Sequence, residues 1–354
     1  MKLHSYIFFE LLTAFVFTLG GILVLALPAI TAAAVHKLAG VEILHVLLYI
    51  PLIVAGLIPY VLPLAYLLSV VHVYGRLAAD NEWTALRMSG RNPLEMFLPG
   101  AVLAAVLGLT TWWLLAEKLP EIRFRQSNFA TAALAETTRH IAPGRTEVKI
   151  KDFYVSAVSR EGDDFVDAYV HIPSQKPGEE DMSVRADRVR FSSDENNIYA
   201  QFINARSVIG GQEVRLGEPV VRIDLDALRR KAGTREKPRY MSSVAMRAKL
   251  DAGKVEPDKI EMFRFEIQYR RALAATCFMF LLLGAPTALM FRRGAQLLPL
   301  AIAVGYALIY YVLSMRLGPI LSEGRAIAPE LAAWAVVILG LVAGVFLTRK
   351  ALSE

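Results

Sequence analysis

One short charged stretch, RLAADNEWTALRMSG (residues 76–90), lies between two apolar stretches that are each long enough to cross a membrane. It contains Arg76, Asp80, Glu82 and Arg87 within a tight connection. These side chains can form ion pairs and hydrogen bonds, and they have no nucleophile beside a general base. The chemistry that this stretch offers is therefore binding.

The same stretch carries the start and stop signals of a short helix. Asp80 and Asn81 can cap its beginning, and Glu82 adds negative charge to the first turn. Gly90 can take the left-handed conformation that ends a helix, and Pro93 begins the next one. The sequence therefore predicts a helix over 77–90.

The predicted helix has two different faces. Trp83 and Leu86 share one face, and Glu82 and Ser89 fall on another. Such a helix could rest on lipid headgroups with Trp83 as its anchor, or it could be gripped by a protein partner. Composition leaves these two interpretations open.

Sites for catalysis and metal binding are missing from the sequence. The histidines show no H-E-x-x-H or other metal spacing, Cys277 is the single cysteine, and no G-x-S-x-G or GxxxxGK[ST] motif occurs. We predict no catalytic residue, no metal site and no cofactor.

Composition indicates a membrane protein. The 354 residues are 55% hydrophobic and 20% charged, with a net charge of +6 and a mean hydropathy of +0.41. The basic residues form no block that would follow a nucleic-acid backbone, so we expect no nucleic-acid partner. Six stretches meet the length of a membrane span: Ile7–Val35, Ile43–Tyr74, Pro93–Ala116, Ala272–Phe291, Leu297–Ile320 and Leu331–Thr348.

Charge asymmetry predicts the orientation of these spans. Lys and Arg lie before the first span, in 76–91, at 292–293 and at 349–350, whereas the alternate short connections mix basic and acidic residues. By the positive-inside rule both termini and the predicted helix are cytoplasmic, and the long insertion is outside the cell membrane. We expect a multi-pass membrane protein with a large domain on the side opposite the termini.

The insertion changes from helical to strand periodicity. Residues 147–151, 166–172, 182–186 and 221–225 alternate apolar and polar side chains, and a helix is expected over Pro120–His140. The basic segment Arg229–Lys259 shows little periodicity and is interpreted as a solvated linker. A helix resumes at Glu261–Arg271, where Glu266 and Arg270 have i,i+4 spacing.

The predicted fold class is therefore an α+β membrane protein, with six transmembrane helices (3+3) around an inserted domain resembling a β-jelly roll. We divide the chain into 1–117 with the predicted helix 77–90, a β-rich domain with flanking helices at 118–265, and the last three spans at 266–354.

The segment Tyr74–Gly90 resembles the signature of the LptF/LptG permease family (also called YjgP/YjgQ), which exports lipopolysaccharide. Two further matches are Glu266-Ile-Gln-Tyr-Arg270 before an apolar helix with Pro286, and Leu317-Gly-Pro-Ile320. The resemblance covers nearly the whole chain, although the insertion matches only in its pattern.

This resemblance implies a set of partners. Family members sit in pairs, as LptF and LptG, on a dimer of the ATPase LptB, and they pass lipopolysaccharide to the bridge proteins LptC and LptA. The connecting helix docks into a groove of the ATPase, so the resemblance assigns the ATPase contact to the residues Glu82, Trp83, Leu86 and Arg87. The chain itself would perform no catalysis.

The resemblance also suggests residues that bind the lipid. Basic residues at the outer end of the first span contact lipid A phosphates in the family, and Lys37 matches that position approximately. We add His36 and Arg316 because cations near the outer ends of spans would meet a phosphate-bearing lipid first, although they could equally reach ordinary membrane lipids. Glu10, near the cytoplasmic start of the first span, is expected to be structural.

A different class of function remains open on the sequence. The chain could be a membrane-anchored sensor or scaffold whose periplasmic β-domain binds a ligand. Copurification of an ATPase would distinguish the permease from this alternative.

Overall fold

A computed structural model describes most of the chain, in segments interrupted at the turns of the insertion and at three interhelical connections. The described residues are 2–38, 43–139, 147–150, 153–161, 164–172, 182–193, 197–209, 212–217, 220–224, 238–291, 297–323 and 327–353. The chain folds into two compact units. Unit 1 comprises Met1–Pro28, Val54–Arg123 and Lys237–Glu354, and unit 2 comprises Ala29–Ile53 and Phe124–Glu236.

Helices make up unit 1 and continue into unit 2. The long ones are α1 (Lys2–Lys37), α2 (Ile43–Ala79), α4 (Leu98–Trp113), α5 (Leu119–Arg139), α8 (Ile260–Met290), α9 (Leu297–Val312) and α11 (Pro329–Ser353). The short ones are α3 (Glu82–Met88), α7 (Ser243–Asp251), α10 (Gly318–Glu323), the 3-10 turns η1 (Pro93–Phe97), η3 (Pro238–Tyr240) and η4 (Pro257–Lys259), and the π-helical turns η2 (Leu114–Lys118) and η5 (Leu313–Leu317).

Six described helical segments are long and apolar enough to cross a membrane. They are Leu3–Lys37, Ile43–Ala79, Pro93–Phe129, Ile260–Met290, Leu297–Ile320 and Pro329–Ser353. Each contains most of one predicted span, so these six predictions are confirmed by length and composition. Leu297–Ile320 has the predicted bounds, and the other five segments begin or end beyond their predictions because the helix continues into more polar residues.

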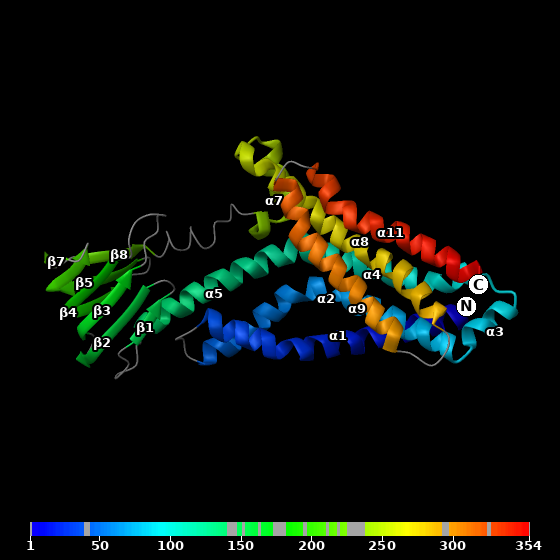
Figure 1. The fold of residues 1–354 in the computed structure, drawn as a ribbon, viewed down its shortest axis with the longest axis horizontal. Coiled ribbons are helices and arrows are strands. Elements are labelled where there is room, and N and C mark those ends of the chain that lie inside the picture. Colours follow the sequence, from blue (N-terminus) through cyan, green and yellow to red (C-terminus); the bar gives the residue numbers. More distant parts are fainter. Residues whose placement is uncertain are drawn as a thin grey trace. The chain divides into compact units, whose positions relative to one another are not determined.

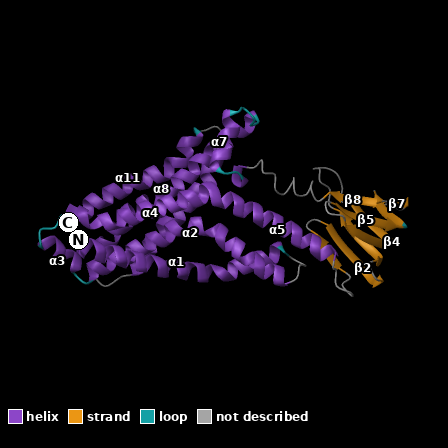
Figure 2. Ribbon diagram, turned by 180° about the vertical axis from the view of Figure 1, so that it is seen from behind, coloured by secondary structure: helices purple, strands orange, loops and turns teal. Residues whose placement is uncertain are grey.

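Helix α8 lies at the centre of unit 1. In its most apolar stretch 78% of the residues are buried, against 11% to 44% in the other five segments. Helix α11 runs alongside α8, as both views show (Figures 1 and 2). Glycines permit this close packing: a Cβ on Gly344 would lie 2.7 Å from the Cβ of Leu282, and one on Gly108 would lie 2.9 Å from the carbonyl oxygen of Ala274.

Unit 2 contains one antiparallel sheet of eight described strands (Figure 2). Its strands are β1 (Glu147–Ile150), β2 (Phe153–Glu161), β3 (Asp164–Ile172), β4 (Met182–Ser193), β5 (Asn197–Ile203), β6 (Ala205–Ile209), β7 (Gln212–Gly217) and β8 (Val220–Asp224). The order is β1-β2-β3-β4-β5-β8, and β6 pairs with both β4 and β7. The four predicted strands are confirmed, and the jelly roll stays a prediction.

The sheet departs from strict alternation at Asp167. This residue has a φ of 51°, which falls in the left-handed region. Phe165 and Ala168 are both buried, whereas alternation alone would place Val166 with Ala168 on one face. The alternation predicted for residues 166–172 is therefore wrong at Val166, which is only half-buried; Val170 and Ile172 have side chains outside those described.

The solvated linker predicted for Arg229–Lys259 is wrong for its described part. Helix α7 lies in this segment, begins at the Ser242 cap and buries Met246 completely. Arg270 on α8 fixes the position of the chain just before α7. Its guanidinium, 1% exposed, donates to the carbonyl oxygens of Pro238 and Met241. These contacts are distant in sequence, which is why local periodicity does not predict them.

The packing of α4 against α8 leads to a first prediction. Gly108→Ala should destabilise the protein by about 1–3 kcal/mol, because its methyl group would press on a backbone oxygen that cannot rotate away. The control is Gly305→Ala on α9, where the added Cβ meets nothing within 4 Å. Thermal unfolding in detergent should show a lower midpoint for the first variant and an unchanged or higher one for the second. Equal midpoints would contradict the close contact.

A second prediction concerns pH. Arg190 donates two hydrogen bonds to Asp164, at 2.6 and 2.8 Å, and holds the pKa of this carboxyl below its usual value. The contribution of the Asp164–Arg190 pair to stability is fully present above about pH 4, the pKa of Asp164 in the unfolded chain. This contribution is lost as the pH falls through the lowered pKa of Asp164 in the folded protein. Hydrogen exchange of β3 and β4 should be faster in Asp164→Asn than in wild type at pH 6. The two proteins should converge once the pH has fallen below the lowered folded pKa of Asp164, and a constant difference would exclude this pair as the cause.

Candidate functional site

Helix α3 forms inside the stretch predicted to be helical, but it covers only Glu82–Met88. The predicted bounds 77–90 are wrong at both ends: residues 77–79 belong to α2, which the left-handed Asn81 separates from α3, and residues 89–90 form the turn after α3. Asn81 occupies the N-cap position with a φ of 58°, and its side chain makes no capping hydrogen bond, contrary to the expected cap. Gly90 has a φ of 77°, and its N–H donates to the carbonyl of Arg87, as expected for a left-handed helix end. With seven residues, α3 is too short to persist by itself and must be held by tertiary contacts.

An aromatic cluster provides the first of these contacts. The ring of Trp83, 1% exposed, lies 6.4 Å from the ring of Tyr74 on α2 and 5.7 Å from that of Phe97 on η1. Tyr74 in turn donates to the carbonyl of Met96 at 2.9 Å. The indole is therefore packed in the protein's own core. It is exposed neither to lipid headgroups nor to a partner, which removes the anchor that the headgroup interpretation required.

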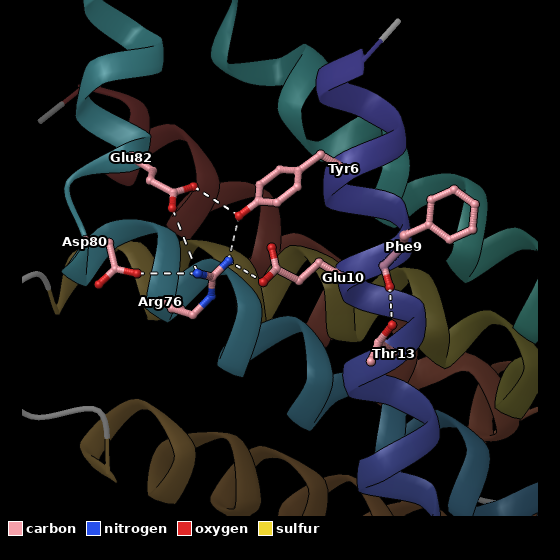
Figure 3. A network of polar contacts seen from close by, with 7 residues as sticks. All are labelled: Tyr6, Phe9, Glu10, Thr13, Arg76, Asp80 and Glu82. Carbon is pink, nitrogen blue, oxygen red and sulfur yellow. Dashed lines mark hydrogen bonds and ion pairs between the residues drawn. The ribbon is translucent and has the colours of Figure 1, made fainter.

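A charged network centred on Arg76 provides the second contact (Figure 3). The Arg76 guanidinium donates to Glu10 and Tyr6 on α1, the latter at 2.9 Å. It also contacts Asp80 at 3.5 Å and Glu82 at 3.9 Å, while the Tyr6 hydroxyl donates to Glu82 at 3.4 Å. The network ties α1, α2 and α3 together, and it confirms that Glu10 has a structural partner.

The charges in this network do not balance. One guanidinium faces the three carboxylates of Glu10, Asp80 and Glu82, of which Glu10 is bound most closely. The Glu82 side chain is 39% exposed and lies farthest from Arg76. Negative charge therefore remains at the surface beside α3, where a basic group from outside could bind it.

The third contact joins α3 to the other end of the sequence. The Arg87 guanidinium donates to the carbonyl of Leu352 at 3.4 Å, close to the end of α11. A cation is favourable there because the last carbonyls of a helix carry partial negative charge. Figure 1 shows both chain ends near α3.

The outward side of α3 is partly apolar. Ala85 and Ser89 are exposed, and Met88 is 84% exposed. Leu86 is partly buried and packs against the same core as Trp83. Of the four residues assigned to a partner contact, Glu82 alone combines exposure with unbalanced charge. The sequence analysis did not single out Met88, because the sequence does not show whether a methionine on a helix is buried or exposed.

The three lipid-binding candidates are not brought together in one described site. In unit 2, Lys37 donates to the hydroxyl of Tyr49 at 2.5 Å and lies 5.2 Å from the centre of its ring, while His36 is exposed. In unit 1, Arg316 is exposed on the π-helical turn η5. Among the described residues no group of three or more His, Cys, Asp or Glu side chains could hold a metal ion.

Arg76→Gln should loosen α3 without unfolding the protein. The ion pairs are partly exposed, so we expect a loss of about 1 kcal/mol and roughly fivefold faster hydrogen exchange of the α3 amides. Asp80→Asn is the matched control and should change the exchange less. The Asp80 side chain is 51% exposed, and its hydrogen bond is the longest of those that Arg76 donates to Tyr6, Glu10 and Asp80. Unchanged exchange in Arg76→Gln would show that the Arg76 network does not hold α3 in place.

Comparison with known proteins gives one result for the whole chain. The profile of the family described as lipopolysaccharide export system permease LptF/LptG matches residues 5–350. No curated protein matches. The matched range includes α3 and nearly all residues of the six apolar helical segments. It confirms the resemblance found in the charged stretch. The chain thus belongs to the LptF/LptG family of lipopolysaccharide export permeases.

Proposed function

We propose that this chain is the permease subunit of an ABC-type complex that extracts lipopolysaccharide from the inner membrane, and that α3 receives the force of a separate ATPase. Family membership supports the export of lipopolysaccharide. The observation that supports the coupling role is that three contacts hold α3: the aromatic cluster of Trp83, the Arg76 network and the Arg87 hydrogen bond. Any displacement of α3 must move α2 and η1 through Trp83, α1 through Arg76 and α11 through Arg87.

The outward surface of α3 fits a basic protein groove. Glu82 supplies the negative charge that Arg76 leaves unbalanced, and Met88 supplies an exposed apolar side chain. A partner with an Arg or Lys beside an apolar groove would satisfy both. In this proposal Glu82 is a direct contact, whereas Trp83, Leu86 and Arg87 hold α3 in position from behind.

The remaining partners follow from the family. The ATPase would be an LptB-like dimer, a second LptF/LptG-type permease would complete the membrane part, and LptC-like and LptA-like proteins would receive the lipid. Both termini would lie in the cytoplasm and the sheet in the periplasm, as the distribution of Lys and Arg predicts. An edge strand of the sheet could pair with a like domain of a bridge protein.

The lipid would meet cations at the outer ends of two spans. His36 and Lys37 end α1, and Arg316 is exposed on η5. The hydrogen bond that Lys37 donates to Tyr49 orients its ammonium, and a phosphate group could replace the hydroxyl as the acceptor. We therefore keep all three residues as proposed lipid contacts.

Met88→Asp tests the docking surface. The side chain is exposed, so the change should leave the fold intact, but burying an unpaired carboxylate in an interface should weaken ATPase binding at least about tenfold. Val244→Asp on α7 is the control, with a side chain 69% exposed on another helix. Both variants are coexpressed with the tagged ATPase, and copurification and lipopolysaccharide transport are measured. ATPase retention and normal transport in Met88→Asp would refute docking on α3.

A further inference from the structure

Arginines stand in a row across three neighbouring strands of the sheet. In the strand registers Arg185 of β4 lies opposite Arg206 of β6, and Arg206 lies opposite Arg215 of β7. All three side chains are exposed. Adjacent strands are about 4.8 Å apart, so the row spans roughly 10 Å from one outer strand to the other.

This row lies on the face opposite the buried side of the sheet. Next to Arg185 on β4, Val184 and Ala186 are buried, and next to Arg206 on β6 the neighbours Ala205 and Ser207 are buried. Because side chains alternate along a strand, Arg185 and Arg206 point away from that packed side. Arg215 is exposed and is the register partner of Arg206, beside a register shift at Ala205/Arg206. One face of the sheet is therefore apolar and packed, and the other presents cations.

The arginines of β4 have acidic partners. Arg185 binds Asp167 at 2.9 and 3.0 Å, and Arg190 binds Asp164. Arg188 lies 3.3 Å from Glu161. Of the side chains that the structure describes, none forms an ion pair with Arg206 or Arg215. Within the described part of the sheet, Arg206 and Arg215 are therefore the members of the row that can bind a further anion.

Such a row is unfavourable for the sheet alone. Like charges directly opposite each other on paired strands are destabilising, and an exposed position could carry a neutral residue at lower cost. An anion that bridges the guanidinium groups removes the repulsion. Phosphate fits best, because the planar fork of N–H donors matches two of its oxygens.

We propose that Arg185, Arg206 and Arg215 bind phosphate groups on the headgroup of the transported glycolipid. The proposal rests on the proposed function for the identity of the lipid, and on the strand register for the site. It predicts that a glycolipid bound to the sheet has its phosphates on the cationic face. Arg206 and Arg215 make the larger contribution, because Arg185 already has a carboxylate partner.

The test uses the full chain with its copurifying ATPase and partner subunits, supplied with ATP, in nanodiscs of zwitterionic phosphatidylcholine, with a photocrosslinker in place of Tyr169. Tyr169 stands next to Arg185 in the same cross-strand row and is 44% exposed. The probes are purified lipopolysaccharide and the same lipid after enzymatic removal of its phosphates. Crosslinking is compared in wild type, in the double variant Arg206→Gln/Arg215→Gln, and in the control Arg188→Gln.

We expect crosslinking of intact lipopolysaccharide to fall at least about tenfold in the double variant and to change less than about twofold in the control. Dephosphorylated lipid should crosslink to wild type as weakly as intact lipid does to the double variant. Without lipid, the double variant should melt at the same or a higher temperature than wild type, because repulsion has been removed. A lower midpoint would show that the two arginines stabilise the sheet, and it would overturn the proposal.

Other outcomes separate this proposal from the proposed function. Strong crosslinking that is equal for both lipids and both proteins would support lipid passage and overturn the phosphate row. No crosslinking of either lipid to wild type would overturn both. Equal capture of phosphatidylglycerol from mixed nanodiscs would show binding of any anionic headgroup, and would overturn specificity for the glycolipid. ATPase copurification, which depends on α3, should be unchanged in the double variant.

Discussion

The burial of Trp83 is the contact on which the proposed coupling surface depends. A helix of seven residues cannot repay the entropy of its own formation, so α3 exists only because its indole is packed against Tyr74 and Phe97. Complete burial of a tryptophan contributes about 3–5 kcal/mol, more than any partly exposed ion pair nearby. The short connection between two spans is thereby a rigid part of the helical unit.

Rigidity and charge have separate origins in this region. The aromatic cluster sets the position of α3, and the Arg76 network sets the electrostatics of its surface. Because one arginine serves three carboxylates, the protein keeps Glu82 partly exposed and incompletely neutralised. A charged surface of this kind can stay hydrated when no partner is bound, and it attracts a basic partner. Exposed charges contribute more to recognition than to folding stability.

The sheet shows a comparable division between its two faces. Its packed face is made of small and branched apolar residues such as Ala168 and Val184, whereas the opposite face carries ion pairs and the arginine row. The left-handed Asp167 interrupts the alternation and still pairs with Arg185. An amphiphilic ligand with a charged headgroup would meet matching chemistry on such a sheet.

Local pattern by itself determined the six apolar helices, four strands, the presence of a helix within residues 77–90, its Gly90 end, the Glu266–Arg270 pair and the family. Each of these depends on neighbouring residues, on the period of 3.6 or 2, or on a short motif. Only the tertiary structure decided that Trp83 points inward and that Glu10 on α1 pairs with Arg76 on α2. It also decided that the segment held by Arg270 contains the helix α7 where a linker was predicted, and that three arginines align across β4, β6 and β7. These contacts join residues far apart in the chain, and burial and register arise only once the helices and strands have packed.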